Sequence, residues 1–261
     1  MFGIYLIIGA FAGILAGMLG VGGGIIVVPA LAAVFLHFKL MPVDYVMHMA
    51  IGTSLATIMI TLLSALRAQL KQGAVRKEMV AQLMPWLIIG TLTGAVVAHD
   101  LPSHYLKIFF GIFLIYVAYR VLFTNLEDRT KALPTLLWRR IVASIIGVLC
   151  SILGAGGGTM LIPLLLRCEL NMREATGTST ACSIGVAFVS TVSFMLLGMS
   201  VMHLPWSTGY VYWPAFLGIA ASSVLFAPVG TAIAYKLPTS VLKRLFGLFL
   251  LVVAIEMLIP V

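Results

Sequence analysis

One apolar, glycine-rich signature occurs twice in this chain, and it restricts the possible folds more than any other feature. Leu19-Gly20-Val21-Gly22-Gly23-Gly24, followed by Pro29, returns as Leu153-Gly154-Ala155-Gly156-Gly157-Gly158, followed by Pro163. In lipid, a glycine run can interrupt a helix only where protein or a polar cavity satisfies the freed backbone groups. The matched pair therefore predicts a transport site.

The composition around both signatures is that of a membrane protein. The chain is 62% hydrophobic and only 9% charged, whereas charged residues make up roughly a quarter of a soluble domain. Three cysteines lie in apolar segments without metal-ligand spacing, so neither a disulfide nor structural zinc is expected. The segments that approach the ~20 residues needed to cross a bilayer are 3–19, 47–66, 79–98, 104–123, 208–235 and 241–259.

The basic residues predict how the segments are oriented. All of the sixteen Lys and Arg residues except Lys39 and Lys107 fall in four stretches, at 67–77, 120–140, 167–173 and 236–244. By the positive-inside rule these stretches are cytoplasmic, which makes 37–46, 99–106 and 200–208 external and places both termini outside. The first half then starts outside and the second starts inside, which is the inverted-repeat plan of many transporters.

The repeat extends beyond the glycines. Ala50–Ser54 recurs as Ala175–Ser179, and Leu101-Pro102-Ser103 recurs as Leu237-Pro238-Thr239. We therefore predict an all-α integral membrane protein of about ten transmembrane segments, built as two inverted repeats of about five segments each. Their Gly-broken or re-entrant hairpins would meet near the midplane. The predicted parts are a first repeat at 1–124, a cytoplasmic linker at 125–136 and a second repeat at 137–261.

The glycine runs are the first candidate binding elements. Helices beginning near Ile25 and Thr159 would present free N–H groups and the positive end of the helix dipole to an anion, and glycine would let the ligand approach the backbone. The alternative is that small residues only allow close helix packing, as we expect for Gly9, Gly13 and Gly17. The glycines predicted to bind substrate are Gly22, Gly23, Gly24, Gly156, Gly157 and Gly158.

Two Gly-Thr-Ser sequences are the second candidate. Their hydroxyls, Thr53, Ser54, Thr178 and Ser179, could hydrogen-bond a desolvated anion, or could bond back to a carbonyl four residues earlier, as membrane helices often do. The matched motifs favour substrate binding for these four. The hydroxyls continue as stripes with helical spacing, a weaker signal, through Thr57, Thr61 and Ser64 in the first half and through Ser183 and Ser190 in the second.

Other chemistry has little support in the sequence. No acid lies at the centre of a predicted span, and no nucleophile, metal-ligand or phosphate-loop motif is found, so we expect no enzyme activity and no cofactor. His48 is interpreted as an interfacial histidine that could titrate. The basic stretches are explained by topology, so no nucleic-acid partner is expected.

At the glycine and Gly-Thr-Ser motifs the chain resembles the sulfite exporter TauE/SafE family, also called the toluene sulfonate uptake permease group. The resemblance spans most of the 261 residues and is carried by 19–24, Pro29, 52–54 and their second-half counterparts. It implies a bacterial-type cell (inner) membrane permease for sulfite, sulfonates or related sulfur-containing or organic anions. Proton or other ion coupling and the oligomeric state stay open.

The leading hypothesis is therefore an alternating-access transporter, with a small anion as substrate and the lipid bilayer as environment. A channel-like anion uniporter is the nearest alternative. A nontransporting membrane scaffold or partner subunit is an alternative from a different class, although the external loops are short.

Overall fold

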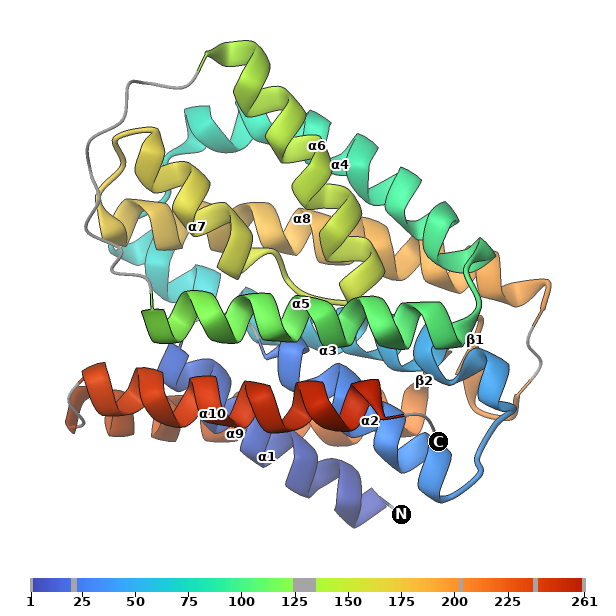
Figure 1. Ribbon diagram of the computed structural model, residues 1–261. Helices are drawn as coiled ribbons and strands as arrows, with labels where there is room; N and C mark the ends of the chain where they lie inside the picture. Colours follow the sequence, from blue (N-terminus) through green and yellow to red (C-terminus); the bar gives the residue numbers. More distant parts are fainter. Residues whose placement is uncertain (1, 20–22, 124–134, 202–203, 237–238, 260–261) are drawn as a thin grey trace.

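The computed structural model describes residues 2–19, 23–123, 135–201, 204–236 and 239–259, and Figure 1 shows that they form a predominantly helical molecule. The elements in chain order are α1 (Phe2–Leu19), α2 (Gly24–His37), a 3₁₀ turn η1 (Val43–Tyr45), α3 (Val46–Lys71), α4 (Lys77–Asp100), α5 (Ser103–Phe123), α6 (Leu136–Leu153), α7 (Gly158–Arg167), α8 (Met172–Met199), strands β1 (Ser207–Thr208) and β2 (Val211–Tyr212), α9 (Trp213–Lys236) and α10 (Thr239–Leu258).

Six of the described helices are long and apolar enough to cross a membrane, namely α3, α4, α5, α6, α8 and α9. The expectation of a helical membrane protein is thereby confirmed. Helix α7 has ten residues and is about 15 Å long at ~1.5 Å per residue, half of the ~30 Å hydrocarbon layer. It cannot span the bilayer alone.

Helix α5 shows why the outer surface suits lipid. One face buries Leu106, Phe110 and Leu114, while Ile112 and Tyr119 on the other face are exposed. Because side chains three and four positions apart share a helix face, this helix presents apolar groups both to the core and to its surroundings. Such an all-round apolar helix is typical of a bilayer environment.

The segment before α9 differs from the prediction of a crossing at 208–235. Ser207 pairs with Tyr212 and Thr208 pairs with Val211 in a small antiparallel hairpin, and the helix begins only at Trp213. Gly209 has a φ of 54°, a conformation that glycine adopts at little cost. The predicted start of this crossing is therefore too early, and the hairpin is a small addition to an otherwise helical architecture.

Helices from the two sequence halves pack in matching pairs. Helix α1 packs against α9, and α6, its counterpart in the sequence repeat, packs against α4. Helix α3 packs against α8 and α5 against α10. Figure 1 shows α5 and α10 side by side and running in opposite directions.

Glycines make the α1–α9 contact close. A Cβ atom on Gly13 would lie 2.5 Å from the carbonyl oxygen of Ser223, and one on Gly9 would lie 2.6 Å from that of Ile219. Any larger residue would push α1 away from α9. The predicted packing role of Gly9 and Gly13 is confirmed, whereas Gly17 lies outside the described side chains.

Candidate functional site

The described ends of the two glycine runs have the same local structure. Gly23 precedes α2 with a φ of 76°, and Gly157 precedes α7 with a φ of 72°. Both angles are left-handed and strongly favour glycine. The helices begin at Gly24 and Gly158, within one residue of the predicted starts, so two helix N-termini follow directly after the glycines. Gly22 lies outside the described residues.

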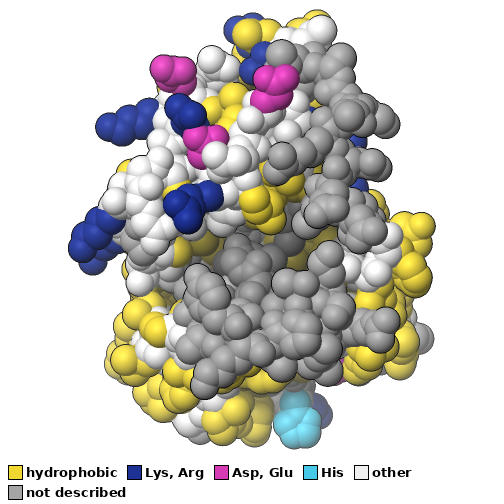
Figure 2. Space-filling view, turned by 90° about the vertical axis from the view of Figure 1, so that its left-hand side faces the viewer, with side chains coloured by type: hydrophobic (Ala, Val, Ile, Leu, Met, Phe, Trp, Pro, Cys, Tyr) yellow, Lys and Arg dark blue, Asp and Glu magenta, His cyan; other side chains and the backbone are white. Residues whose placement is uncertain are grey.

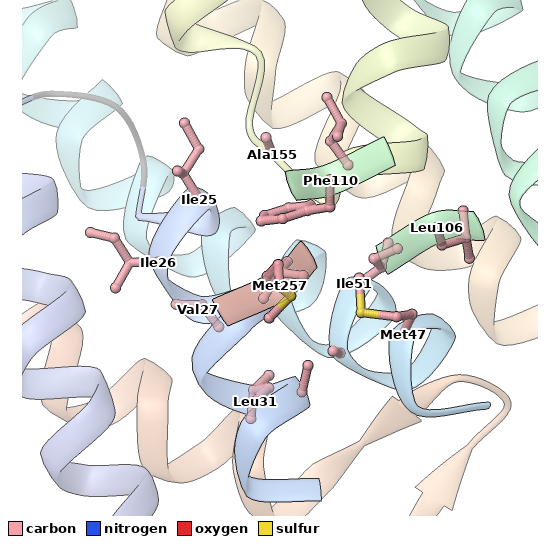
Figure 3. Packing of buried hydrophobic residues seen from close by; sticks show 14 of the residues in the cluster. Ile25, Ile26, Val27, Leu31, Met47, Ile51, Leu106, Phe110, Ala155 and Met257 are labelled. Carbon is pink, nitrogen blue, oxygen red and sulfur yellow. The ribbon is translucent and has the colours of Figure 1, made fainter. Parts of the chain in front are cut away.

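The start of α2 lies against the tip of the second hairpin. A Cβ atom on Gly24 would lie 2.6 Å from the carbonyl oxygen of Gly154 and 3.2 Å from the Cα of Ala155. Figure 3 shows Ile25 and Ala155, from the two glycine segments, in one apolar cluster with Phe110 of α5 and Met257 of α10. The segments are therefore neighbours in space although about 130 residues separate them in the repeat.

Helix α3 holds the second hairpin from the side of the first half. The Ser54 hydroxyl, fully buried, donates a hydrogen bond of 3.2 Å to the carbonyl oxygen of Gly154. One turn later, Ile58 lies against Gly156, where a Cβ atom would come within 2.9 Å of the isoleucine methyl carbon. The predicted residue Ser54 thus contacts the second glycine run, which includes the predicted residue Gly156.

The two threonines of the Gly-Thr-Ser motifs make equivalent contacts. Thr53 Oγ1 accepts the backbone N–H of Tyr212, just before α9, at 3.0 Å. Thr178 Oγ1 accepts the backbone N–H of Arg76, just before α4, at 3.1 Å. Both threonines are buried. Each motif fixes the segment that enters a following helix, and substrate binding by either threonine remains a prediction.

The glycines of the two Gly-Thr-Ser motifs leave room for the backbone of the segments that precede α9 and α4. A Cβ atom on Gly52 would lie 2.5 Å from the carbonyl oxygen of Tyr210, and one on Gly177 would meet the carbonyl oxygen of Ala74. The sequence repeat could reveal the motif but not this contact, because the partner segments differ in sequence.

A small cavity lies beside the first glycine run. It has a volume of about 10 Å³, the space of about one water molecule. Gly23, Thr57, Thr61 and Ser223 line it, together with apolar residues. The Thr61 and Ser223 hydroxyl oxygens are 3.3 Å apart. The sequence analysis did not identify Ser223 as a lining residue, because the sequence gives no indication that α9 packs beside α1 and α3.

A larger, charged pocket opens at the end of the molecule where α4 and α8 begin. Its volume is about 290 Å³. Arg76 and Glu174 form an ion pair there, with Arg76 Nε 2.8 Å from Glu174 Oε1. Figure 2 views the end of the molecule at the left of Figure 1 and shows Lys and Arg side chains gathered there with acidic ones. The other lining residues are Glu78, Met79, Gln82, Arg139, Cys168, Glu169 and Leu170.

Cys168 lies in this pocket just after α7. Burial raises the pKa of its thiol, although the positive charge of Arg139 acts in the opposite direction. The thiol is therefore protonated at neutral pH and is a poor nucleophile. Within residues 2–19, 23–123, 135–201, 204–236 and 239–259, no group of three or more His, Cys, Asp or Glu side chains could hold a metal ion.

His48, near the start of α3, is buried within the protein. Only 2% of it is exposed, and Nε2 lies 2.9 Å from the carbonyl oxygen of Ala98. Its ring lies 5.1 Å from that of Tyr210, whose hydroxyl oxygen is 3.0 Å from Nδ1 of His99. The loop after β1 covers this end of α3. The burial of His48 therefore depends on a segment some 160 residues away and could not be predicted from the residues next to it in the chain.

Comparison with known proteins gives a consistent result. A family model described as sulfite exporter TauE/SafE matches residues 5–257. A Haemophilus influenzae protein named "Probable membrane transporter protein" is 34% identical over 255 residues, covering 97% of this chain and 96% of that protein. A Methanocaldococcus jannaschii protein, also named a probable membrane transporter protein, is 27% identical over 264 residues, covering 98% of this chain and 95% of its own length.

No solved structure shows a significant match to the chain. The match to the family model covers nearly the whole length and includes both glycine runs and both Gly-Thr-Ser motifs. The chain therefore belongs to the sulfite exporter TauE/SafE family and is a multi-pass membrane transporter.

Proposed function

We propose that the protein carries a small oxyanion, such as sulfite or a sulfonate, by alternating access between inverted repeats at 1–124 and 137–261. The observation that carries the proposal is the contact between the start of α2 and the glycine segment before α7. Gly24 touches Gly154, and each glycine run holds a left-handed glycine directly before a helix. A helix N-terminus provides free N–H donors and a favourable dipole for an anion, and α2 begins beside the segment that leads into α7.

The matched contacts of the two halves support the alternating-access part. Thr53 and Thr178 accept equivalent backbone N–H groups, and the pair α1–α9 corresponds to the pair α6–α4. When two halves have equivalent packing but opposite orientation, exchanging their conformations exposes a central site to opposite sides. The cavity at Gly23 holds about one water molecule, so an oxyanion needs the hairpins to separate before it binds.

The charged pocket supports a cytoplasmic assignment for the end where α4 begins. It contains Arg76 and Arg139, which belong to two of the basic stretches. By the positive-inside rule this end faces the cytoplasm of a bacterial-type inner membrane, and the termini face outside.

Flux measurements in proteoliposomes test the proposal. We expect saturable uptake of radiolabelled sulfite, inhibited by unlabelled sulfite and by a small sulfonate, and absent from protein-free liposomes. A pH gradient tests coupling to protons. Gly157→Val should abolish uptake because valine cannot adopt its left-handed backbone without strain, whereas Gly3→Val, in open space, should not.

The alternatives predict different results. A sulfite flux that rises linearly with the sulfite concentration and does not depend on the pH gradient would favour a channel-like uniporter. Absence of flux for sulfite, sulfonates and other small anions would favour a nontransporting membrane partner and would refute the proposal.

A further inference from the structure

Two serines of α8 are buried without a hydrogen-bond partner in the described part of the chain. Ser179 and Ser183 are each only 1% exposed, and neither hydroxyl oxygen has a partner among the described residues. Other hydroxyls of the same helix are satisfied: Thr180 donates to Thr176 O at 2.9 Å, and Thr191 donates to Ala187 O at 2.7 Å. Burying a hydroxyl without a hydrogen bond costs free energy of folding. The presence of serine at these two positions therefore needs an explanation.

Ser183 points toward the second glycine run. Its Oγ lies 3.3 Å from the position that a Cβ atom on Gly157 would occupy, and Cys150 Sγ lies 3.2 Å from the same position. Gly157 caps α7, a helix of ten residues, so the hydroxyl stands beside a helix N-terminus. Ser179 is one turn earlier and on the same face of α8.

The first half lacks this arrangement. By the Gly-Thr-Ser alignment, Ser179 corresponds to Ser54 and Ser183 to Ile58. Ser54 already donates to Gly154 O, and Ile58 packs its side chain against Gly24 and Gly156. At these two matched positions, unpaired hydroxyls are therefore found in the second half, although Tyr5 and Thr91 of the first half also have buried hydroxyls with no partner among the described residues.

We propose that Ser183, with Ser179, donates hydrogen bonds to an oxyanion bound at the N-terminus of α7, which makes the substrate site asymmetric between the halves. This inference rests on the proposed function. The oxyanion supplies the acceptors that the two hydroxyls lack among the described residues. A site of neutral donors suits a small sulfonate or sulfite group, because oxygen acceptors are what hydroxyls and backbone N–H groups recognise.

The test compares Ser183→Ala with Ser190→Ala. Ser190 is also buried on α8, but it donates to the Ser151 hydroxyl at 3.3 Å. Sulfite affinity is measured by calorimetry on purified protein, and thermal unfolding is measured on the same samples. Ser183→Ala should weaken binding about tenfold or more, the usual effect of losing a hydrogen bond to a charged ligand. Its unfolding temperature should be unchanged or higher, because an unpaired hydroxyl is removed.

The control should behave oppositely. Ser190→Ala should leave affinity within about twofold and lower the unfolding temperature, because it breaks an internal hydrogen bond. Ser183→Thr, which keeps a hydroxyl, should retain most of the affinity. Ser179→Ala should follow Ser183→Ala.

Two failures can be distinguished. If the wild-type protein binds and transports sulfite while Ser183→Ala does so with unchanged affinity, this inference is overturned and the proposed function survives. If the wild-type protein neither binds nor transports sulfite or a sulfonate, the proposed function fails and the inference fails with it.

Discussion

At the scale of single residues, identical side chains in the two halves meet different needs. Thr53 and Thr178 each accept a backbone N–H, so their hydroxyl oxygens hold the chain in place. Ser54 and Ser179 are also matched in sequence, yet only Ser54 has a hydrogen-bond partner within the described structure. A motif therefore identifies positions of interest, and the partner atoms decide the role.

Replacing Thr53 by valine tests the role of the threonine hydroxyl. We expect Thr53→Val to lower the free energy of unfolding by about 1–3 kcal/mol, because the Tyr212 N–H loses its acceptor while side-chain volume is nearly conserved. Thr176→Val is the matched control, since Thr176 Oγ1 only donates to Met172 O in its own helix. Thermal unfolding in detergent measures both. Equal effects would contradict a special role for Thr53.

At the scale of helices, small residues set the distances. Gly13 faces Ser223 across the α1–α9 contact, and Gly94 faces Val148 across the α4–α6 contact, where a Cβ atom would lie 2.6 Å from the Val148 carbonyl oxygen. Without a hydrophobic drive between helices in lipid, close backbone approach and van der Waals contact hold them together. The sequence signal for the α1–α9 contact was glycine at helical spacing, at Gly9 and Gly13.

Gly13→Ala tests the α1–α9 contact. The added methyl group would overlap the backbone of Ser223, so we expect a loss of about 1–3 kcal/mol in stability, typical of overpacking. Transport should fall in parallel, because α1 leads into the first hairpin. Gly3→Ala serves as control, since a Cβ atom there meets nothing within 4 Å. If both variants unfold at the wild-type temperature, the contact is looser than the structure indicates.

At the scale of the whole molecule, the orientation in the membrane can be measured. Cys150, Cys168 and Cys182 are all buried, so an introduced cysteine should give the main labelling signal. Gln72 and Val43 are exposed and lie at the two ends of α3. A membrane-impermeant maleimide should label Gln72→Cys only from the cytoplasmic side and Val43→Cys only from outside.

Right-side-out and inside-out vesicles supply the two conditions for this experiment, and unsubstituted protein gives the background. Reversed labelling would overturn the orientation and the assignment of the charged pocket to the cytoplasm. Labelling of both positions from one side would contradict a membrane crossing by α3.

Some features were accessible from local sequence alone. Spans long enough for a bilayer, the broken helices after the glycine runs and the close packing at Gly9 and Gly13 follow from composition, spacing and the conformational freedom of glycine. These properties depend on a residue and its near neighbours in the chain. The hairpin before α9 was missed, because two short strands carry little signal against an apolar background.

Other features depended on which distant segments pack together. The burial of His48 requires the loop that carries Tyr210. The ion pair Arg76–Glu174 connects the start of α4 to α8. Ser183 becomes a candidate ligand only because its hydroxyl lies beside Gly157. Sequence by itself determined that the chain is a membrane protein with a duplicated, glycine-broken core. Tertiary structure decided which hydroxyls are satisfied and which remain free, because a hydrogen bond depends on atoms brought within about 3 Å, and chain neighbours alone do not supply them.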